Sequence, residues 1–246
     1  MRVFPTLLPP SAWWRGFAAS LALAGAGLLG DRVSLAQAPP SAQPPANPQA
    51  VVDQVQAFYD KARTFQSDFH QEFLVKAYNQ TKTSRGHVTF SKPGKMSWAY
   101  DEPAGNRVVS DGSTVWVYQA SDKQLYESAI NQSQYPAAVS FLTGTGKLGD
   151  SFNFTLRDGN DPAQKKTALG FPGGWVLLGT PKAATPSYQK VLFYVDKATS
   201  QVLRVLILDG QGNTNTFTFD APRVNDPVDP GQFTFTPPPG TNIVRP

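Results

Sequence analysis

Cysteine is absent from the 246-residue sequence, histidine occurs only twice, and charged residues make up only 16%. Without thiols the chain can form no disulfide, no thiolate metal site, no cysteine nucleophile and no thioether-linked lipid anchor. His70 and His87 stand in neither H-x-x-x-H nor H-E-x-x-H spacing, so we expect no metal and no other cofactor. Sixteen Phe, eight Tyr and five Trp supply a large core, which excludes a long disordered chain.

The charge balance is nearly even. Lys and Arg number 22 against 18 Asp and Glu, a formal net charge of +4. Residues 1–38 hold three Arg and one Asp, so the remainder carries 19 positive and 17 negative side chains, a net charge of +2. Such a balance does not favour nucleic acid as a partner, and we expect none.

Residues 1–38 have the composition of an export signal. Arginines come before an apolar run at 17–30, which is about the length of a signal-peptide h-region and shorter than the roughly 20 residues that span a bilayer. Cleavage is predicted after Ala36 or after Ala38, although Pro39 fits poorly behind the second site. We therefore expect a soluble mature protein in the periplasm, with an uncleaved anchor helix as the alternative.

The mature chain begins with a Pro-rich linker at 39–48, followed by one domain at 49–246. Asn47 is a good N-cap and Pro48 suits the first helical position, which predicts a helix over 49–63. Apolar residues then recur at helical spacing on one face. They are Val51, Val55, Phe58, Tyr59 and Ala62.

After Phe65 the hydrophobic period changes to two, which indicates strands separated by Gly, Pro, Asn and Asp turns. A short helix at 135–143 interrupts them. The predicted later strands are 85–91, 95–101, 106–110, 114–119, 123–128, 151–158, 174–179, 188–196, 201–209, 213–220 and 232–236. Because twist accumulates in a large antiparallel sheet, we expect a mainly β (α+β) fold, an unclosed barrel of about eleven strands with a helical lid over its concave hydrophobic face.

The strands carry more large apolar residues than two short helices can cover. The residues predicted to face the inside are Met96, Trp98, Tyr100, Val115, Val117, Phe152, Phe154, Leu156, Leu192 and Tyr194. Such side chains either fill the barrel or line a ligand cavity, and the pattern leaves both open.

No enzyme signature is present. Asp68, His70 and Glu72 share one strand face that alternates with phenylalanines, which predicts a solvated face. The glycines of 144–146 lack the Lys-Ser/Thr of a P-loop, and 110–112 is a turn. We expect a binding protein, with a secreted hydrolase using the Asp68 cluster as the alternative.

Four stretches together resemble one family. They are 65–71 (FQSDFHQ), 86–98 (GHVTFSKPGKMSW), 110–118 (SDGSTVWVY) and 232–240 (QFTFTPPPG). In this order, behind an export signal, they resemble the LolA family of periplasmic outer-membrane lipoprotein carriers over residues 50–244.

The resemblance implies a monomeric chaperone that binds lipoprotein acyl chains in a hydrophobic cavity. It would take acylated lipoproteins from an inner-membrane lipoprotein-releasing ABC transporter (LolCDE-like) to a LolB-like outer-membrane receptor. It implies that 49–63 and 135–143 form the lid. The cavity and lid residues would be Tyr59, Phe65, Phe69, Met96, Trp98, Val117, Val139 and Leu142. The arginine that latches the family's lid corresponds to Lys92, which lacks the guanidinium fork and can bond fewer carbonyls.

Two related functions were weighed beside this one. The outer-membrane acceptor of the same fold is itself a lipoprotein and needs a cysteine directly after its signal, so the absence of cysteine excludes its lipid-anchored form. A carrier or sensor for another envelope lipid, a glycolipid or phospholipid, remains an alternative on the same fold.

Overall fold

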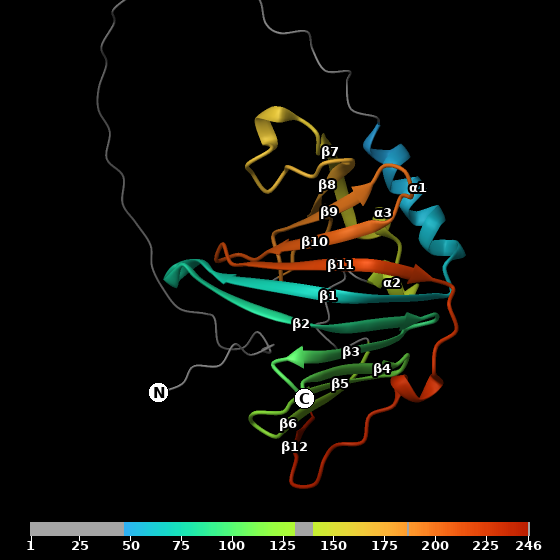
Figure 1. Ribbon diagram of the computed structural model, residues 1–246, viewed down its shortest axis with the longest axis vertical. Coiled ribbons are helices and arrows are strands. Elements are labelled where there is room, and N and C mark those ends of the chain that lie inside the picture. The colour runs from blue at the N-terminus through green and yellow to red at the C-terminus, as the bar shows by residue number, and fades with distance from the viewer. Residues whose placement is uncertain (1–46, 131–139, 186, 246) are drawn as a thin grey trace, which may run out of the picture. The chain divides into compact units, whose positions relative to one another are not determined.

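Twelve strands form one sheet in the computed structural model, which describes residues 47–130, 140–185 and 187–245 (Figure 1). The order is β12-β6-β5-β4-β3-β2-β1-β11-β10-β9-β8-β7, and all neighbours are antiparallel except β12 and β6. The strands β12 and β7 are its two edges and do not pair with each other. The predicted unclosed antiparallel sheet with few helices is therefore confirmed.

The elements follow one another along the chain with short connections. The strands are β1 (Thr64–Val75), β2 (Gln80–Ser91), β3 (Lys95–Glu102), β4 (Arg107–Asp111), β5 (Thr114–Gln119), β6 (Gln124–Ala129), β7 (Phe152–Asp158), β8 (Gly174–Pro181), β9 (Lys190–Asp196), β10 (Val202–Leu208), β11 (Thr214–Val224) and β12 (Asn242–Val244). The α-helices are α1 (Pro48–Lys61), α2 (Ser140–Thr143) and α3 (Leu148–Ser151), and the 3₁₀ helices are η2 (Lys76–Tyr78), η4 (Pro162–Gln164) and η5 (Pro230–Phe233).

Helix α1 begins where the sequence predicts. The Asn47 side chain accepts a hydrogen bond from the Gln49 N–H at 3.0 Å, and Pro48 occupies the first helical position. The buried residues of the helix follow its apolar stripe. They are Val51, Val52, Val55 and Tyr59. The helix ends at Lys61, two residues before the predicted boundary, because Ala62 already has extended backbone.

Strand β1 shows how the sheet separates its two faces. Phe65 and Phe69 are buried, whereas Asp68, His70 and Glu72 are exposed, so the predicted alternation is present. Its two partners come from distant parts of the chain, β2 on one side and β11 on the other. In Figure 1 the long β1–β2 hairpin crosses the middle of the sheet, with β11 beside it. This pairing joins the early and late halves of the chain into one sheet.

The prediction that Leu192 and Tyr194 face the inside is wrong. Their neighbours in β9 face the main core instead, and Leu192 and Tyr194 join a second cluster with Val176. The segment after β7 covers this side of the sheet, and the Tyr194 hydroxyl donates to the Ala168 carbonyl at 2.6 Å. Strand β9 is thus buried on both faces, so its hydrophobic pattern could not identify the inner one.

The predicted strand at 232–236 is also wrong. Residues 230–233 form the helix η5 and the following residues are not a strand. Phe233 is buried where η5 packs against β3 and β4, and the Phe235 ring lies 5.4 Å from that of Tyr118. Phenylalanines that alternate as in a strand here attach the last segment to the sheet by their rings. The chain pairs with the sheet only later, as β12.

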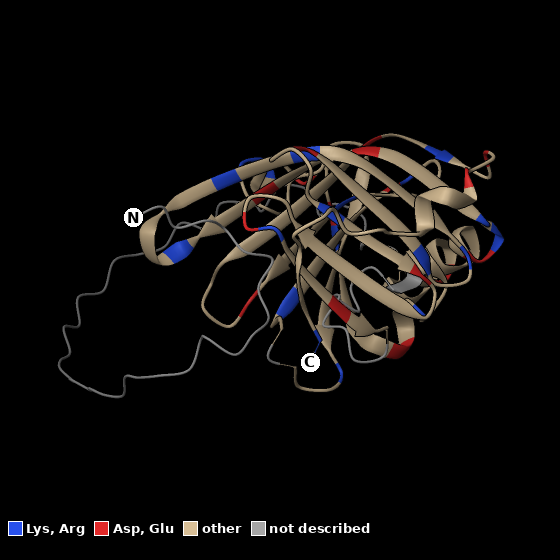
Figure 2. Ribbon diagram, turned by 90° about the horizontal axis from the view of Figure 1, so that it is seen from below, with Lys and Arg blue, Asp and Glu red and all other residues tan. Residues whose placement is uncertain are grey.

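Several predicted segments lie outside the described residues, including the export signal, nearly all of the linker and residues 135–139 of the predicted second helix. Its remainder is α2, at 140–143. In the described part of the chain, no helix is both long and apolar enough to cross a membrane. Figure 2 shows basic and acidic positions interspersed along the ribbon, without a face of one sign.

Gly86 tests the close approach of β2 and β3. A Cβ atom at this position would lie 2.0 Å from the Ala99 carbonyl oxygen, at the irregularity where the β2–β3 register shifts. Because backbone atoms would have to move, Gly86→Ala is expected to lower the free energy of unfolding by about 1–3 kcal/mol in urea titrations. Gly210→Ala, whose Cβ would meet nothing closer than 3.7 Å, is the control. Equal stability of the two variants would contradict the packing described here.

Candidate functional site

The concave face of the sheet and the helices over it bring most of the predicted site residues together. One hydrophobic cluster contains Tyr59, Phe65, Phe69, Met96, Trp98 and Leu142, each at most 2% exposed. Val117 is half-buried and packs against the same cluster. Val139 lies outside the described residues. The predicted set is therefore one contiguous group, although its role as a lipid site remains a prediction.

Aromatic rings form a continuous path through this interior. The Phe69 ring centroid lies 4.9 Å from that of Trp98 and 5.1 Å from that of Tyr100, both edge-on. Phe90 bridges Trp98 and Phe65, with ring centroids 5.8 Å from each. Edge-on pairs at these separations attract one another beyond simple area burial. The interior is thus lined mainly by carbon and presents few polar atoms.

Tyr59, on the last turn of α1, joins the helix to the sheet at two points. Its backbone carbonyl accepts a hydrogen bond from the Lys92 ammonium group, in the turn between β2 and β3. Its phenol oxygen accepts one from the Val202 N–H, at the start of β10, at 3.1 Å. One residue therefore ties α1 to two strands that lie on opposite sides of β1 and β11 in the sheet.

Burial governs the ionisation of both groups. It raises the pKa of the completely buried Tyr59 phenol, against the smaller lowering effect of the Val202 N–H, so the phenol stays neutral at physiological pH. Partial burial lowers the pKa of the Lys92 ammonium, and the Asp60 carboxylate offsets part of this fall. Lys92 thus reaches the helix from a site where its charge is partly desolvated.

The connection from α1 to β1 is bonded to the end of β11. The Arg63 N–H donates to the Asn225 side-chain oxygen at 2.7 Å, and the Asn225 N–H donates to the Thr64 carbonyl at 3.0 Å. Asn225 has a φ of 66°, in the left-handed region that asparagine tolerates better than most residues. The sequence analysis missed Asn225; an Asn that follows a strand pattern is its only local signal.

The two short helices are attached near the same turn. The Gly94 N–H donates to the Thr143 carbonyl of α2 at 2.9 Å, and the Leu148 N–H of α3 donates to the Gln56 side chain of α1 at 3.0 Å. At Gly144, a Cβ atom would lie 2.8 Å from the Lys92 side chain. The Lys92 stem therefore runs between α1 and the end of α2. We call α1 and α2 the lid from here on.

Apolar contact, rather than hydrogen bonding, dominates the attachment of the lid. Fully burying one valine contributes about 1.5–3 kcal/mol, so Val51, Val52 and Val55 together contribute on the order of 6 kcal/mol. A single hydrogen bond contributes about 0.5–1.5 kcal/mol net. The bonds to Tyr59 and Arg63 therefore set the position of α1 more than its binding strength.

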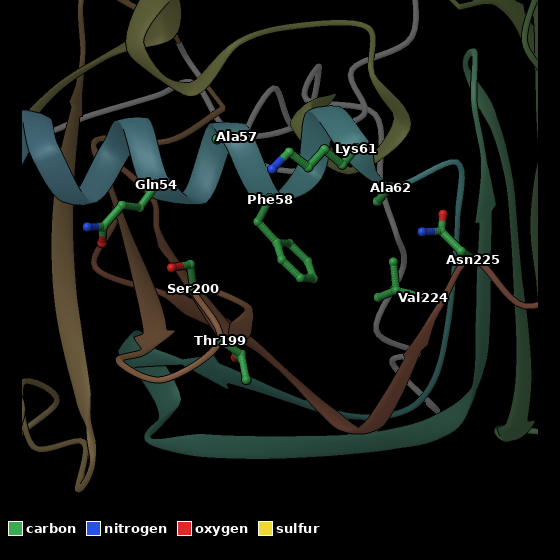
Figure 3. Close-up of a pocket in the computed structure, with 9 residues that line it drawn as sticks. All are labelled: Gln54, Ala57, Phe58, Lys61, Ala62, Thr199, Ser200, Val224 and Asn225. Carbon is green, nitrogen blue, oxygen red and sulfur yellow. The ribbon is translucent and has the colours of Figure 1, made fainter.

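A pocket of about 410 Å³ lies beside the last turns of α1 (Figure 3). The helix forms one wall, and the turn before β10 and the end of β11 form the other. In Figure 3 the Phe58 ring points from the helix into the space between these walls. The lining residues are Gln54, Ala57, Phe58, Lys61, Ala62, Thr199, Ser200, Val224 and Asn225. We call this the hinge pocket.

The polar cluster that could have served a hydrolase lies on the outer face of the sheet. His70 and Glu72 are 3.7 Å apart and exposed, and the His87 ring lies 2.6 Å from the Asp68 carboxylate. None of these residues lines the hinge pocket or belongs to the buried cluster. Among the described residues, no group of three or more His, Cys, Asp and Glu could hold a metal ion.

Other core residues escaped the sequence analysis although their pattern was visible. Phe217 and Phe219 alternate along β11, and their rings lie 5.3 and 6.2 Å from that of Trp98. The strand was predicted, but its inward side was not identified. Val202 could not have been found, because it contributes a backbone N–H rather than a side chain.

Tyr59→Phe tests the second anchor of α1. The substitution keeps the ring but leaves the Val202 N–H without its phenol acceptor, so the free energy of unfolding is expected to fall by about 1–3 kcal/mol in urea titrations. Tyr78→Phe, at an 81% exposed position, is the control and should change stability by less than about 0.5 kcal/mol. A Tyr59→Phe variant as stable as the control would mean that this hydrogen bond does not hold the helix.

Comparison with known proteins identifies the family. The sequence profile described as "Outer membrane lipoprotein carrier protein LolA" matches residues 60–236. An outer-membrane lipoprotein carrier protein of Nitrosomonas europaea is 28% identical over 197 residues, 80% of this chain and 89% of that protein. The Ralstonia nicotianae protein of the same name is 29% identical over 201 residues, 79% and 86% of the two chains.

Solved structures similar to this one include an uncharacterized conserved protein from Thermus thermophilus, with a TM-score of 0.49 at 15% identity over 80% of this chain and 98% of the other. A LolA superfamily protein from Nitrosomonas europaea has a TM-score of 0.43 at 12% identity over 77% and 98% of the two chains. The profile match alone spans well over half of the 246 residues. The chain therefore belongs to the outer membrane lipoprotein carrier protein LolA family.

Proposed function

We propose that this protein is a non-catalytic periplasmic carrier that binds the acyl chains of lipoproteins beneath its lid. The observation that carries the proposal is the buried aromatic cluster under α1, in a chain of the LolA family. Relatives named as outer-membrane lipoprotein carrier proteins match about four fifths of this chain. The predicted export signal would deliver the chain to the compartment that such cargo has to cross.

Energetics supports acyl chains as the ligand. Each CH₂ group removed from water contributes about 0.8 kcal/mol, so a chain of about 16 carbons gains roughly 12 kcal/mol gross. Separating α1 from the sheet costs on the order of 6 kcal/mol for its three buried valines. The cargo can therefore displace the lid and still bind. Because the cost of moving the lid is subtracted from the affinity, the cargo can also be released.

The polar bonds of α1 suit such a movement. Those from Lys92, Val202 and Asn225 all meet the segment from Tyr59 to Arg63. Most of the helix before this segment is held by side-chain packing, which has no strict geometry and can be exchanged for hydrocarbon. We infer that the last turn keeps the helix in register while its earlier turns make room for the cargo. Tyr59, Phe65, Phe69, Met96, Trp98, Val117, Val139 and Leu142 are the proposed lid and cavity residues.

The proposed partners follow from this role. The carrier would receive lipoproteins from an inner-membrane lipoprotein-releasing ABC transporter and pass them to an outer-membrane receptor, acting as a monomer. The decisive experiment incubates the purified mature protein with spheroplasts that retain a triacylated lipoprotein. The expected product is a soluble one-to-one complex of carrier and lipoprotein. Recovery of the lipoprotein only with the membranes, in the presence of folded carrier, would refute the proposal.

The same purification addresses the alternative cargo. Mass spectrometry of the lipid extracted from the carrier would detect a glycolipid or a phospholipid in place of lipoprotein acyl chains. Such a result would retain the interior as a lipid site and replace the proposed cargo.

Met96→Glu is expected to abolish loading. Met96 is 2% exposed within the aromatic cluster, and a carboxylate there has a desolvation cost of several kcal/mol. Met96→Leu, which nearly preserves the volume, should load normally. Circular dichroism verifies folding, and Val117→Glu at a half-buried position gives a second, milder variant. Normal loading of both folded Glu variants would place the acyl chains elsewhere.

Lys92→Arg is expected to hold the lid more firmly. A guanidinium group can reach the Tyr59 carbonyl and a second carbonyl at the helix end, whereas Lys92→Met removes the donor and keeps the stem. Hydrogen exchange of the α1 amides should slow in the Arg variant and accelerate about tenfold in the Met variant, as expected for about 1.4 kcal/mol. Exchange in the β1–β2 hairpin should be unchanged. Identical α1 exchange in both variants would remove Lys92 as the latch.

A further inference from the structure

The hinge pocket adjoins the core through two of its lining side chains. Phe58 and Val224 are only partly buried, and both pack against the hydrophobic cluster beneath the lid. The Phe58 ring lies 5.0 Å from that of Tyr59, edge-on. Phe58 therefore stands between a pocket on the outside and the interior that we propose for acyl chains.

Phe58 has space to move without breaking the bonds of the hinge. A cavity of about 150 Å³ accommodates a benzene ring, and the hinge pocket is larger, at about 410 Å³. Ring packing holds Phe58, whereas Tyr59 and Arg63 beside it are fixed by hydrogen bonds. A rotation of the Phe58 side chain into the pocket would uncover the cluster behind it and leave those bonds in place.

The lining suits a chain with an apolar body and a polar end. Ala57, Phe58, Ala62 and Val224 supply apolar surface. The other lining residues are polar, namely Gln54, Lys61, Thr199, Ser200 and Asn225. Lys61 is a cation and no carboxylate lines the pocket, so the rim complements carboxylate or ester oxygens. A fatty acyl chain with its carbonyl end at the rim matches both parts.

We propose that the hinge pocket is the mouth through which an acyl chain enters and leaves the interior, with Phe58 as the gate. This inference rests on the proposed function, because it assumes that the interior takes hydrocarbon. A gate lies on the path to the bound state and contributes little to that state itself. It therefore governs the rates of binding and release and leaves the equilibrium affinity unchanged.

The test measures how fast a fatty acid reaches Trp98. Stearic acid brominated at mid-chain is mixed with the mature carrier in a stopped-flow instrument, and quenching of Trp98 fluorescence reports its arrival in the core. Trp116 and Trp175 are replaced by phenylalanine so that Trp98 alone reports. Dissociation is followed as fluorescence recovers when liposomes remove the fatty acid.

Ala57→Phe fills the pocket from an exposed position on α1. It is expected to lower both rate constants about tenfold, which corresponds to about 1.4 kcal/mol in the barrier, with the dissociation constant unchanged within about twofold. Phe58→Ala is expected to raise both rate constants. Gln54→Phe fills the same pocket from another turn and serves if Ala57→Phe does not fold.

Ala50→Phe is the matched control. Ala50 is exposed on the same face of α1, seven residues or about 10 Å earlier, and does not line the pocket. It should leave both rates unchanged. Pocket-filling variants that bind and release as fast as this control would overturn the mouth, as would a loss of affinity without a change in association rate. Absence of quenching in the unsubstituted carrier would instead refute lipid binding itself.

Discussion

The concave face of an unclosed sheet has to be covered by something other than its own strands, and this requirement organises the molecule. Twelve strands curl without pairing their edges, so the aromatic side chains on the inner face have no opposing strands to meet. Helix α1, with only fourteen residues, supplies much of the cover. Its contact with both halves of the sheet converges on Tyr59, whose carbonyl is bonded to the β2–β3 turn and whose phenol is bonded to β10.

This arrangement separates strength from position. Buried valines give α1 most of its attraction to the core, while hydrogen bonds at its last turn decide where it lies. Non-directional contacts can be exchanged for contacts with hydrocarbon, whereas hydrogen bonds cannot. A lid built in this way can give up part of its packing to a ligand and return to one defined position. That combination suits a carrier, which has to bind its cargo and also release it.

The outer face of the sheet explains why the inner one was only partly predicted. Where one face is solvated, as in β1, alternation of Phe65 and Phe69 with charged residues separated inside from outside correctly. Where both faces are covered, as in β9, Leu192 and Tyr194 look no different from their inward neighbours. Phe233 and Phe235 failed for a related reason, since their rings pack on other elements without belonging to a strand. Pattern reports that a residue is buried, but not against what.

Local chemistry was sufficient for much of this protein. Composition excluded thiol chemistry, Asn47 and Pro48 marked the start of α1, and period-two alternation located most strands, because these signals depend only on near neighbours in the chain. Contacts between distant residues were decided by the tertiary structure alone. Asn225 meets Arg63, and Val202 meets Tyr59, across separations of 162 and 143 residues. The hinge pocket likewise exists only because α1, the turn before β10 and the end of β11 converge, which no local pattern encodes.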